Sequence, residues 1–268
     1  MTTVPESQDG ANPMARKVVI ALAIISLVGG VGIGVYALFA SLGVWMGMWN
    51  FGTGFNMLRN VNASADWLAW IGLAVTIVVF LGARRLAMPN TLRLTTIAAI
   101  GAFAAMLAYV VPETFRPPEG TPPIHDITTD TVNPPEYIAI APLRADAPNN
   151  MVYGEQANWD KARMSAAQKE AYPDIVPQVF SEPKEVIFER ALKAATDLGW
   201  EIIDQNPATG RIEATDTTFW FRFKDDVVIV VTPTAQGSVL NARSLSRVGT
   251  SDVGKNAARL REFFARLR

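Results

Sequence analysis

The sequence contains one histidine, His125, and it stands directly beside Asp126. A histidine next to carboxylates can act as a general base. The serines that could supply a nucleophile are Ser244, Ser246 and Ser251. The Gly-x-Ser-x-Gly pattern of a nucleophile elbow is absent, and the segment Thr128–Asp130 has side chains that favour an ordered turn. We therefore predict a structural clasp between a tether and a sheet, with a general base as the alternative.

A second group of residues could bind an anion. The segment Ser246–Asp252 ends a predicted strand, turns, and opens a predicted helix, whose free N–H groups favour negative charge. Arg243 and Arg247 are four residues apart, so they lie on one face of a regular strand and could join the site. The alternative is plain helix capping, with Ser251 as the N-cap and Asp252 in the first turn.

Other chemistry is limited by composition. The chain has no cysteine, which excludes disulfides, iron–sulfur clusters and thiolate zinc sites, and one histidine excludes a multi-histidine metal site. Asp126, Asp130, Glu136 and Asp225–Asp226 could bind a hard cation, but their spacing is not that of a calcium loop. We interpret them as a solvated acidic surface and predict no metal, no cofactor and no catalytic residue.

The net charge of −1 is unevenly distributed along the chain. Residues 112–226 contain 11 basic and 20 acidic residues, whereas residues 227–268 contain 7 and 2. No broad positive field covers the chain, so we predict no nucleic-acid partner.

Three apolar stretches occupy the first 111 residues: Val18–Val44, Trp67–Ala83 and Leu92–Val111. About 20 apolar residues match the hydrocarbon thickness of a bilayer, so each stretch predicts a transmembrane helix. A cleaved signal peptide is the alternative for the first stretch. No acidic or basic residue lies within the cores of these stretches, which argues against transport.

Short-loop charges predict the orientation. The basic residues cluster before the first stretch and around the second connection: Arg16, Lys17, Arg84, Arg85 and Arg93. We therefore predict a multi-pass protein of the bacterial inner (cytoplasmic) membrane, with a cytoplasmic N-terminus and a periplasmic C-terminal domain. The aromatic-rich loop Trp45–Asp66 should lie along the outer interface, with a quinone or lipid pocket as the alternative. Gly30 and Gly34 have the spacing of a close helix contact.

The remainder of the chain is predicted to be a tether and a soluble domain. Residues 112–135 contain seven prolines, which indicates an extended stalk after the membrane anchor of residues 1–111. The domain, residues 136–268, begins with a mixed stretch that should wrap over its surface and that includes one short helix, Ser165–Ala171. A second helix should start at the Ser181 cap and end before Gly199, and a third should cover Ser251–Leu267.

Between these last two helices the pattern predicts four strands in hairpin succession. Five segments have strand-like patterns, one more than the predicted number of strands: Trp200–Gln205, Arg211–Thr215, Thr218–Phe223, Val227–Thr232 and Val239–Val248. Short turns require antiparallel pairing, and helices must cover an apolar face of the sheet. The predicted fold class is α+β: three N-terminal transmembrane helices, then a two-layer sandwich of a four-stranded antiparallel sheet with two helices on one face.

Several motifs resemble those of the bacterial domain-of-unknown-function family 1499 (DUF1499). They are His125–Asp130 with Asn133–Pro135, Tyr172–Ile175, Arg211–Thr215, Phe223–Val227, and Ser244–Gly249 with Ser251, Asp252, Gly254 and Asn256. The resemblance spans about residues 124–268 and implies the same sandwich, without an established activity. It also implies an arginine within Val228–Val231, an acidic residue at Asn241 and a basic one at Thr250, all of which this chain lacks.

From these observations we predict an anchored domain that binds a protein or lipid partner without catalysis and that also contacts membrane lipids. The alternative is an envelope hydrolase acting on a lipid or cell-wall ester, with His125 as base. The candidate binding residues are His125, Asp126, Asp130, Arg243, Ser246, Arg247, Ser251, Asp252 and Asn256.

Overall fold

The structure, a computed structural model, describes residues 12–156 and 159–268. The chain divides into two compact units, Met1–Arg116 and Pro117–Arg268, each of which is described by itself. The second unit therefore begins inside the segment predicted as a tether. Its early residues Ile124–Thr129 are buried, so only a few residues link the two units.

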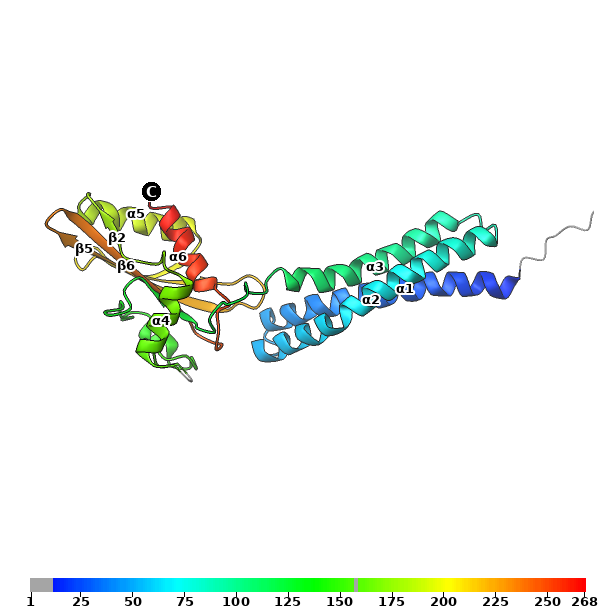
Figure 1. Cartoon of the computed structure of the whole chain (residues 1–268), viewed down its shortest axis with the longest axis horizontal. Coiled ribbons are helices and arrows are strands. Elements are labelled where there is room, and N and C mark those ends of the chain that lie inside the picture. Colours follow the sequence, from blue (N-terminus) through cyan, green and yellow to red (C-terminus); the bar gives the residue numbers. More distant parts are fainter. Residues whose placement is uncertain (1–11, 157–158) are drawn as a thin grey trace, which may run out of the picture. The chain divides into compact units, whose positions relative to one another are not determined.

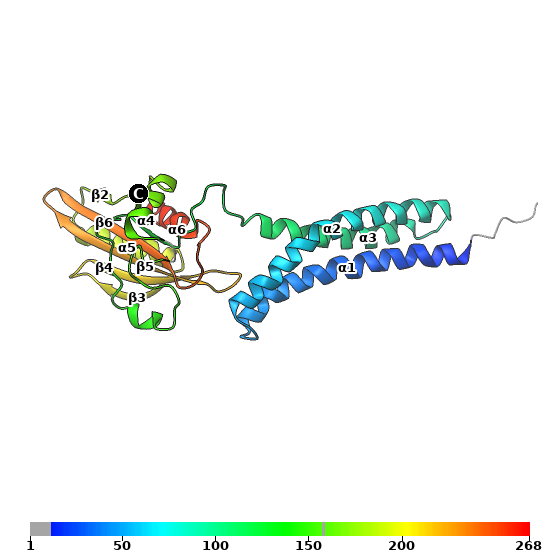
Figure 2. The ribbon, with the colours of Figure 1, turned by 60° about the horizontal axis from the view of Figure 1, so that its bottom comes forward.

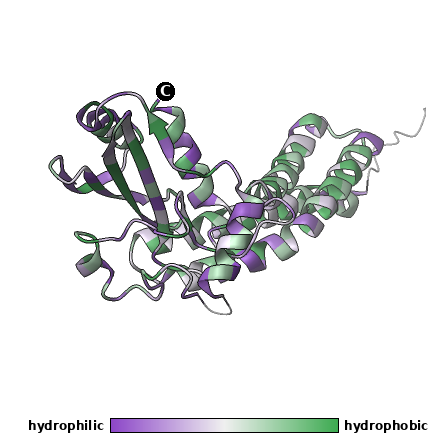
Figure 3. Ribbon diagram, turned by 60° about the vertical axis from the view of Figure 1, so that its left-hand side comes forward, coloured by the Kyte–Doolittle hydropathy of each residue, from purple (hydrophilic) through white to green (hydrophobic). Residues whose placement is uncertain are grey.

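The first unit consists of three helices, α1 (Pro13–Trp45), α2 (Phe51–Arg85) and α3 (Thr91–Glu113). All three are long and apolar enough to cross a membrane. Even α3, with 23 residues, extends about 35 Å at 1.5 Å per residue, more than the hydrocarbon core of about 30 Å. Hydrophobic residues cover these helices along most of their length (Figure 3). The prediction of three N-terminal apolar helices is confirmed.

The prediction of an interfacial loop over Trp45–Asp66 is wrong. Helix α1 runs to Trp45, and α2 begins only a few residues later, at Phe51. The side chain of Asn50 accepts a hydrogen bond from the Thr53 N–H at 3.0 Å and so caps the new helix. The aromatic residues beyond this cap are therefore helical, and the polar residues among them concealed the continuous helix in the sequence.

Small residues let the three helices pack closely around the middle of α3. A side chain at Gly30 on α1 would overlap the Gly101 carbonyl of α3, and one at Gly101 would overlap the backbone of Ser26. On the other side of α3, a Cβ at Gly72 of α2 would lie 2.9 Å from Ala102 Cα. Gly30 thus serves an intramolecular contact, whereas Gly34 has only one atom near, at 3.8 Å.

The second unit is built on an antiparallel sheet. Its strands are β1 (Asp126–Thr128), β2 (Gln178–Phe180), β3 (Glu201–Asn206), β4 (Arg211–Thr217), β5 (Lys224–Thr234) and β6 (Gly237–Ser246). The order is β1-β6-β5-β4-β3, and β2 also pairs with β6 (Figure 2). Strands β1 and β2 share one edge of β6, opposite residues 243–245 and 238–240 respectively.

The sheet differs from its prediction in two ways. It has six strands instead of four, because β1 and β2 have three residues each and leave no readable alternation. The segment Thr218–Phe223 is a connection, not a strand. Arg222 there has φ = 55°, a left-handed conformation that breaks an extended chain. The four longer strands do follow one another in antiparallel succession, as predicted.

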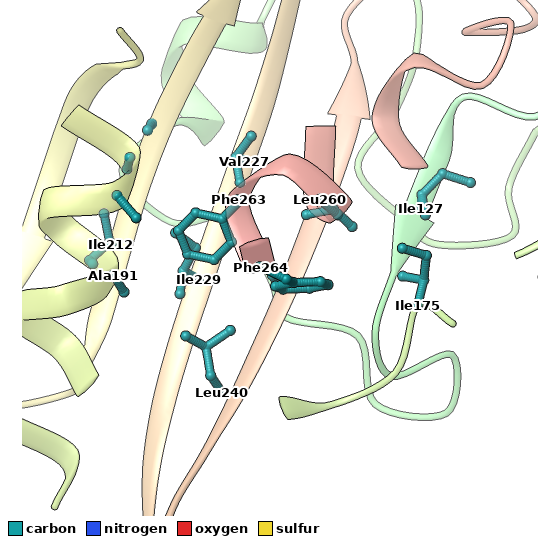
Figure 4. Packing of buried hydrophobic residues seen from close by; sticks show 14 of the residues in the cluster. Ile127, Ile175, Ala191, Ile212, Val227, Ile229, Leu240, Leu260, Phe263 and Phe264 are labelled. Carbon is teal, nitrogen blue, oxygen red and sulfur yellow. The ribbon is translucent and has the colours of Figure 1, made fainter. Parts of the chain in front are cut away.

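Helices α5 (Lys184–Asp197) and α6 (Lys255–Ala265) supply much of the main core (Figure 1). Side chains that alternate along β4, β5 and β6 meet them, as the close view in Figure 4 shows. The core includes Ala191, Ile212, Val227, Ile229, Leu240, Leu260 and Phe263. The predicted Ser181 cap is wrong, because Pro183 holds the N-cap position of α5.

The other face of the sheet is covered by irregular chain. Tyr137 and Ile140 pack against Val228 and Leu245, and a short 3-10 helix, η1 (Ala141–Arg144), follows. The predicted wrapping of this stretch over the domain is confirmed. The helix α4 (Lys161–Ala171) is four residues longer than its prediction at the N-terminal end, where Asp160 caps it.

Candidate functional site

Arg243 is the centre of the polar face of the sheet. Its Nε and Nη2 donate to Asp126 Oδ1 and Oδ2 at 2.8 and 2.7 Å, a bidentate pair between β6 and β1. The guanidinium also donates to the carbonyl oxygens of Pro135 and Met151, at 3.1 and 2.6 Å. Arg243 is 1% exposed and Asp126 2% exposed, so the pair is shielded from solvent. It joins the first strand of the domain to the last.

Two tyrosines enclose the same guanidinium. The Arg243 Cζ lies 5.1 Å from the ring centre of Tyr137 and 5.8 Å from that of Tyr153. Burial opposes the charge of Arg243, but the neighbouring Asp126 outweighs it and raises the pKa of the guanidinium. Burial raises the pKa of the Tyr137 and Tyr153 hydroxyls, so both remain neutral. The Arg243 guanidinium is therefore a permanent cation, and aromatic rings and backbone carbonyl groups surround most of it.

Arg247 lies on the same face as Arg243 but has a different partner. Its Nε and Nη2 donate to the two oxygens of Asp226, both at 2.9 Å. Arg144 from η1 donates to Asp226 Oδ2 at 2.6 Å, and Thr215 donates to Oδ1 at 2.7 Å. Two arginines thus share one carboxylate that is fully buried. These contacts attach the wrapping chain to β5.

Arg243 and Arg247 do not lie at the start of α6, where the sequence predicted that they could join an anion site. Strand alternation places Arg243 and Arg247 on the face opposite to α6, so neither joins its N-terminus. Ser251 is not the N-cap; that position belongs to Gly254, which has φ = 84°. The carboxylate of Asp252 accepts from the N–H groups of Gly254 and Asn256, both at 2.8 Å. Burial raises the pKa of Asp252 to about 6.

Asn256 connects three elements of the other face. Its Nδ2 donates to the His125 carbonyl at 2.9 Å and to Ser246 Oγ at 3.0 Å. Its Oδ1 accepts from Ser244 Oγ at 2.6 Å. Asn256 is fully buried, so these bonds replace solvent and attach α6 to β6 and to the chain before β1.

His125 is buried, at 5% exposure. Burial lowers the pKa of its imidazole, while the neighbouring Asp126 raises it by a smaller amount. The Nδ1 atom has no hydrogen-bond partner, and no serine hydroxyl of the described residues bonds to the ring. Asp130 accepts from the N–H groups of Val132 and Asn133, both at 2.9 Å. These contacts agree with the predicted clasp.

Three of the five acidic residues considered for a cation bind arginines instead. Asp225 accepts from Arg259 Nη2 at 2.6 Å, as Asp126 and Asp226 accept from their own arginines. Within residues 12–156 and 159–268, no group of three His, Asp or Glu residues could hold a metal ion. The interpretation of these carboxylates as a solvated surface is wrong for all three, because each is buried in an ion pair.

A groove of about 770 Å³ opens on the polar face beside Arg243. It is lined by Val132, Asn133, Pro134, Pro135, Glu136, Tyr137, Met151, Val152, Tyr153, Lys161, Arg211, Val230, Asn241 and Arg243. Lys161 Nζ donates to the Val132 carbonyl at 2.7 Å, and Arg211 donates to the Glu136 carbonyl. The lining is therefore partly apolar and partly basic, with one acidic side chain.

The sequence model of the family described as "Protein of unknown function (DUF1499)" matches residues 126–267, more than half of the chain. The chain belongs to the DUF1499 family. No curated protein matches the sequence. The matched DUF1499 region begins at β1 and ends just after α6, so it includes both faces of the sheet and the groove. The family identity suspected from the motifs is thus confirmed.

The DUF1499 domain of this chain contains functional candidates that sequence reasoning missed. Buried Glu213 accepts from the N–H groups of Ile138 and Ile140 at 2.8 and 2.9 Å. Arg259 of α6 donates to Asp216 and Asp225 at 2.8 and 2.6 Å. The adjacent pair Asp225–Asp226 was the available signal, because side chains alternate across a strand and one carboxylate must face each layer.

Two departures from the expected DUF1499 pattern meet in the groove. Val230 and Asn241 are cross-strand partners of β5 and β6, and both line the groove. Asn241 Oδ1 accepts from Thr129 Oγ1 at 2.9 Å. The resemblance implies charges in this part of the sheet in relatives; here an apolar and a neutral polar side chain occupy it.

Proposed function

We propose that this protein is a non-catalytic binding protein of the bacterial inner membrane. Its three helices anchor it with a cytoplasmic N-terminus, and its DUF1499 domain lies in the periplasm and binds a protein or lipid partner. The family and the three apolar helices support the general class. The orientation and the binding site each rest on a separate argument.

Positive charge at one end of the helical unit supports the orientation. Arg16 Nη2 donates to the Leu86 carbonyl at 3.3 Å, so the start of α1 and the α2–α3 connection lie at the same end. Arg84 and Arg85 in the last turn of α2 add to this end. Lysine and arginine in short loops mark the cytoplasmic side, and three crossings then bring the end of α3 to the opposite side.

Reporter fusions test this orientation. Alkaline phosphatase fused after Arg268 should be active, and green fluorescent protein fused there should be dark, because the first matures outside the cytoplasm and the second inside it. A matched pair of fusions after Met88, in the α2–α3 connection, should give the reverse result. Fluorescence without phosphatase activity at Arg268 would contradict the proposed compartment.

The groove is the observation that carries the binding function. Its volume of about 770 Å³ is in the range of ligand sites, and Lys161 and Arg211 give it more positive than negative charge. Val132 and Val152, both more than half exposed, add apolar surface at its edges. The buried ion pairs beneath it fix its floor but present no base with a nucleophile. This arrangement favours recognition over turnover.

Site-specific photo-crosslinking tests the groove. A photoreactive amino acid at Val152 should capture a partner in intact cells, whereas one at exposed Val186 on α5 should not. The variant Val132→Trp, which partly fills the groove, should remove the Val152 adduct because it occupies the partner's position. The matched variant Val186→Trp should leave the adduct unchanged. Equal capture at Val152 and Val186, or an adduct that survives Val132→Trp, would count against the groove.

A further inference from the structure

The groove beside Arg243 offers a ligand more hydrogen-bond donors than acceptors. Its arginines and its lysine already occupy backbone acceptors in the wall, which are the carbonyl oxygens of Val132, Pro135, Glu136 and Met151. An ammonium group has three donors and a guanidinium five, so Lys161 and Arg211 retain further N–H groups beyond these bonds. A ligand that pairs with this wall must therefore supply acceptors.

Strand register places another donor in the same row as Arg211. Arg211 of β4 pairs with Val230 of β5, and Val230 pairs with Asn241 of β6, so the three side chains form one row across the sheet. Asn241 Oδ1 accepts from Thr129 Oγ1 at 2.9 Å, which leaves the amide Nδ2 as the donor of that side chain. The row lines the groove and combines a cation, an apolar side chain and an amide donor.

The positive charge of the groove is concentrated at Lys161 and Arg211. Asp126 neutralises Arg243 through their buried bidentate pair. Glu213 lies 3.5 Å from Arg211 Nη1, but its two oxygens also accept from backbone N–H groups, so it is shared. Lys161 is exposed and Arg211 is half-buried, so both can meet a ligand from solvent. The groove therefore attracts negative charge.

Lys161 and Arg211 bind the two ends of one short segment. Lys161 donates to the Val132 carbonyl and Arg211 to the Glu136 carbonyl, so the two acceptors are four residues apart. A fully extended segment of this length spans at most about 14 Å. Gly154 packs against the start of α4, because a Cβ there would overlap the Lys161 backbone. The two cations thus lie close enough for one short ligand to bridge them.

We propose that the groove binds an extended acidic peptide segment of a partner protein, with one carboxylate at Lys161 and another at Arg211. This inference rests on the proposed binding function of the groove and names its partner. Side chains two or four residues apart share one face of an extended peptide and lie about 7 or 14 Å apart, which suits the spacing of the two cations. Asn241 Nδ2 then donates to a carbonyl oxygen of the peptide.

A peptide fits this lining better than the acyl chain of a lipid does. An acyl chain has no acceptor, so covering Lys161, Arg211 and Asn241 with it would remove water from three polar side chains without replacing their hydrogen bonds. A peptide carries carbonyl oxygens along its whole length. Its apolar side chains can pack on Val132 and Val152, which are exposed at the edges of the groove.

Selection from random heptapeptides tests the class of ligand. The full-length protein is immobilised in mild detergent, and the retained peptides are sequenced. We expect enrichment of Asp and Glu at positions two or four residues apart. For a fluorescent peptide of the enriched sequence, Lys161→Gln and Arg211→Gln should each lower the affinity about two- to fivefold, as for a partly exposed ion pair. The matched control Lys193→Gln, on the exposed side of α5, should leave the affinity unchanged.

Reversing the charge of the groove gives a readout that unfolding cannot imitate. The double variant Lys161→Glu with Arg211→Glu should retain peptides rich in Lys and Arg instead of acidic ones. Pulse proteolysis reports whether this variant is folded. If it is unfolded, Lys161→Glu alone, at an exposed position, should lose the preference for one of the two acidic residues.

The inference and the binding function of the groove can fail separately. Retention of no peptide, or of peptides without acidic residues, would overturn the inference. So would acidic peptides that bind Lys161→Gln and Arg211→Gln as tightly as the unaltered protein, or binding of dioctanoyl phosphatidylglycerol in place of peptides, which would indicate a lipid ligand. In each case a Val152 adduct that Val132→Trp removes would still support the groove as a binding site, whereas absence of that adduct would count against the function itself.

Discussion

Replacing Arg243 with alanine should lower the free energy of unfolding of the DUF1499 domain by about 3–5 kcal/mol. The change leaves the Asp126 carboxylate buried without its bidentate partner, and it frees the carbonyl oxygens of Pro135 and Met151. It also removes the cation between Tyr137 and Tyr153. The measurement is pulse proteolysis of the full-length protein in urea, following the C-terminal fragment.

Two further variants test whether the loss of stability comes from breaking a buried ion pair or from removing any arginine. Arg261→Ala breaks an ion pair with Asp174 whose side chains are 44% and 52% exposed, so it should cost less than about 1 kcal/mol. Combining Arg243→Met with Asp126→Leu removes both charges and should recover much of the lost stability. If Arg243→Ala were as mild as Arg261→Ala, the ion pair would not support the domain.

Replacing Gly101 with leucine should destabilise the helical unit by about 1–3 kcal/mol or more, because its side chain would overlap the α1 backbone at Ser26. Thermal denaturation in mild detergent, followed by circular dichroism, measures the loss. The matched control is Gly32→Leu in α1, where a new Cβ meets nothing within 4 Å. Equal melting temperatures for the two variants would contradict close packing at the centre of α3.

The sequence predicts best those parts of the fold that depend on composition and long periodic patterns. The three apolar stretches predicted the three helices, and the strand-like patterns predicted β3 to β6. Strands β1 and β2 could not be predicted from the sequence. Each has only three residues and is extended because it pairs with β6, and that pairing depends on how the whole domain folds. The predicted starts of two helices were also wrong. Ser181 and Ser251 are suitable N-cap residues by type, but Pro183 and Gly254 hold the N-cap positions.

The candidate site was predicted in part. Arg243, Arg247 and Asp126 were singled out, and alternation correctly put the two arginines on one face. Their partners could not be predicted, since Asp126 and Arg243 are 117 residues apart and Arg144 comes from an irregular segment. The groove was missed for the same reason, because loops and strands distant in the sequence form its walls.

The pairing of β1 with β6 also determines when the domain can be completed. The first strand must wait for the last, because the arginine that binds the Asp126 carboxylate lies 117 residues further along the chain. At 5–20 residues per second, a ribosome needs about 6–23 s to make that length. During this interval β1 has no partner strand, and apolar surface that stays exposed in an incomplete domain is where aggregation can begin.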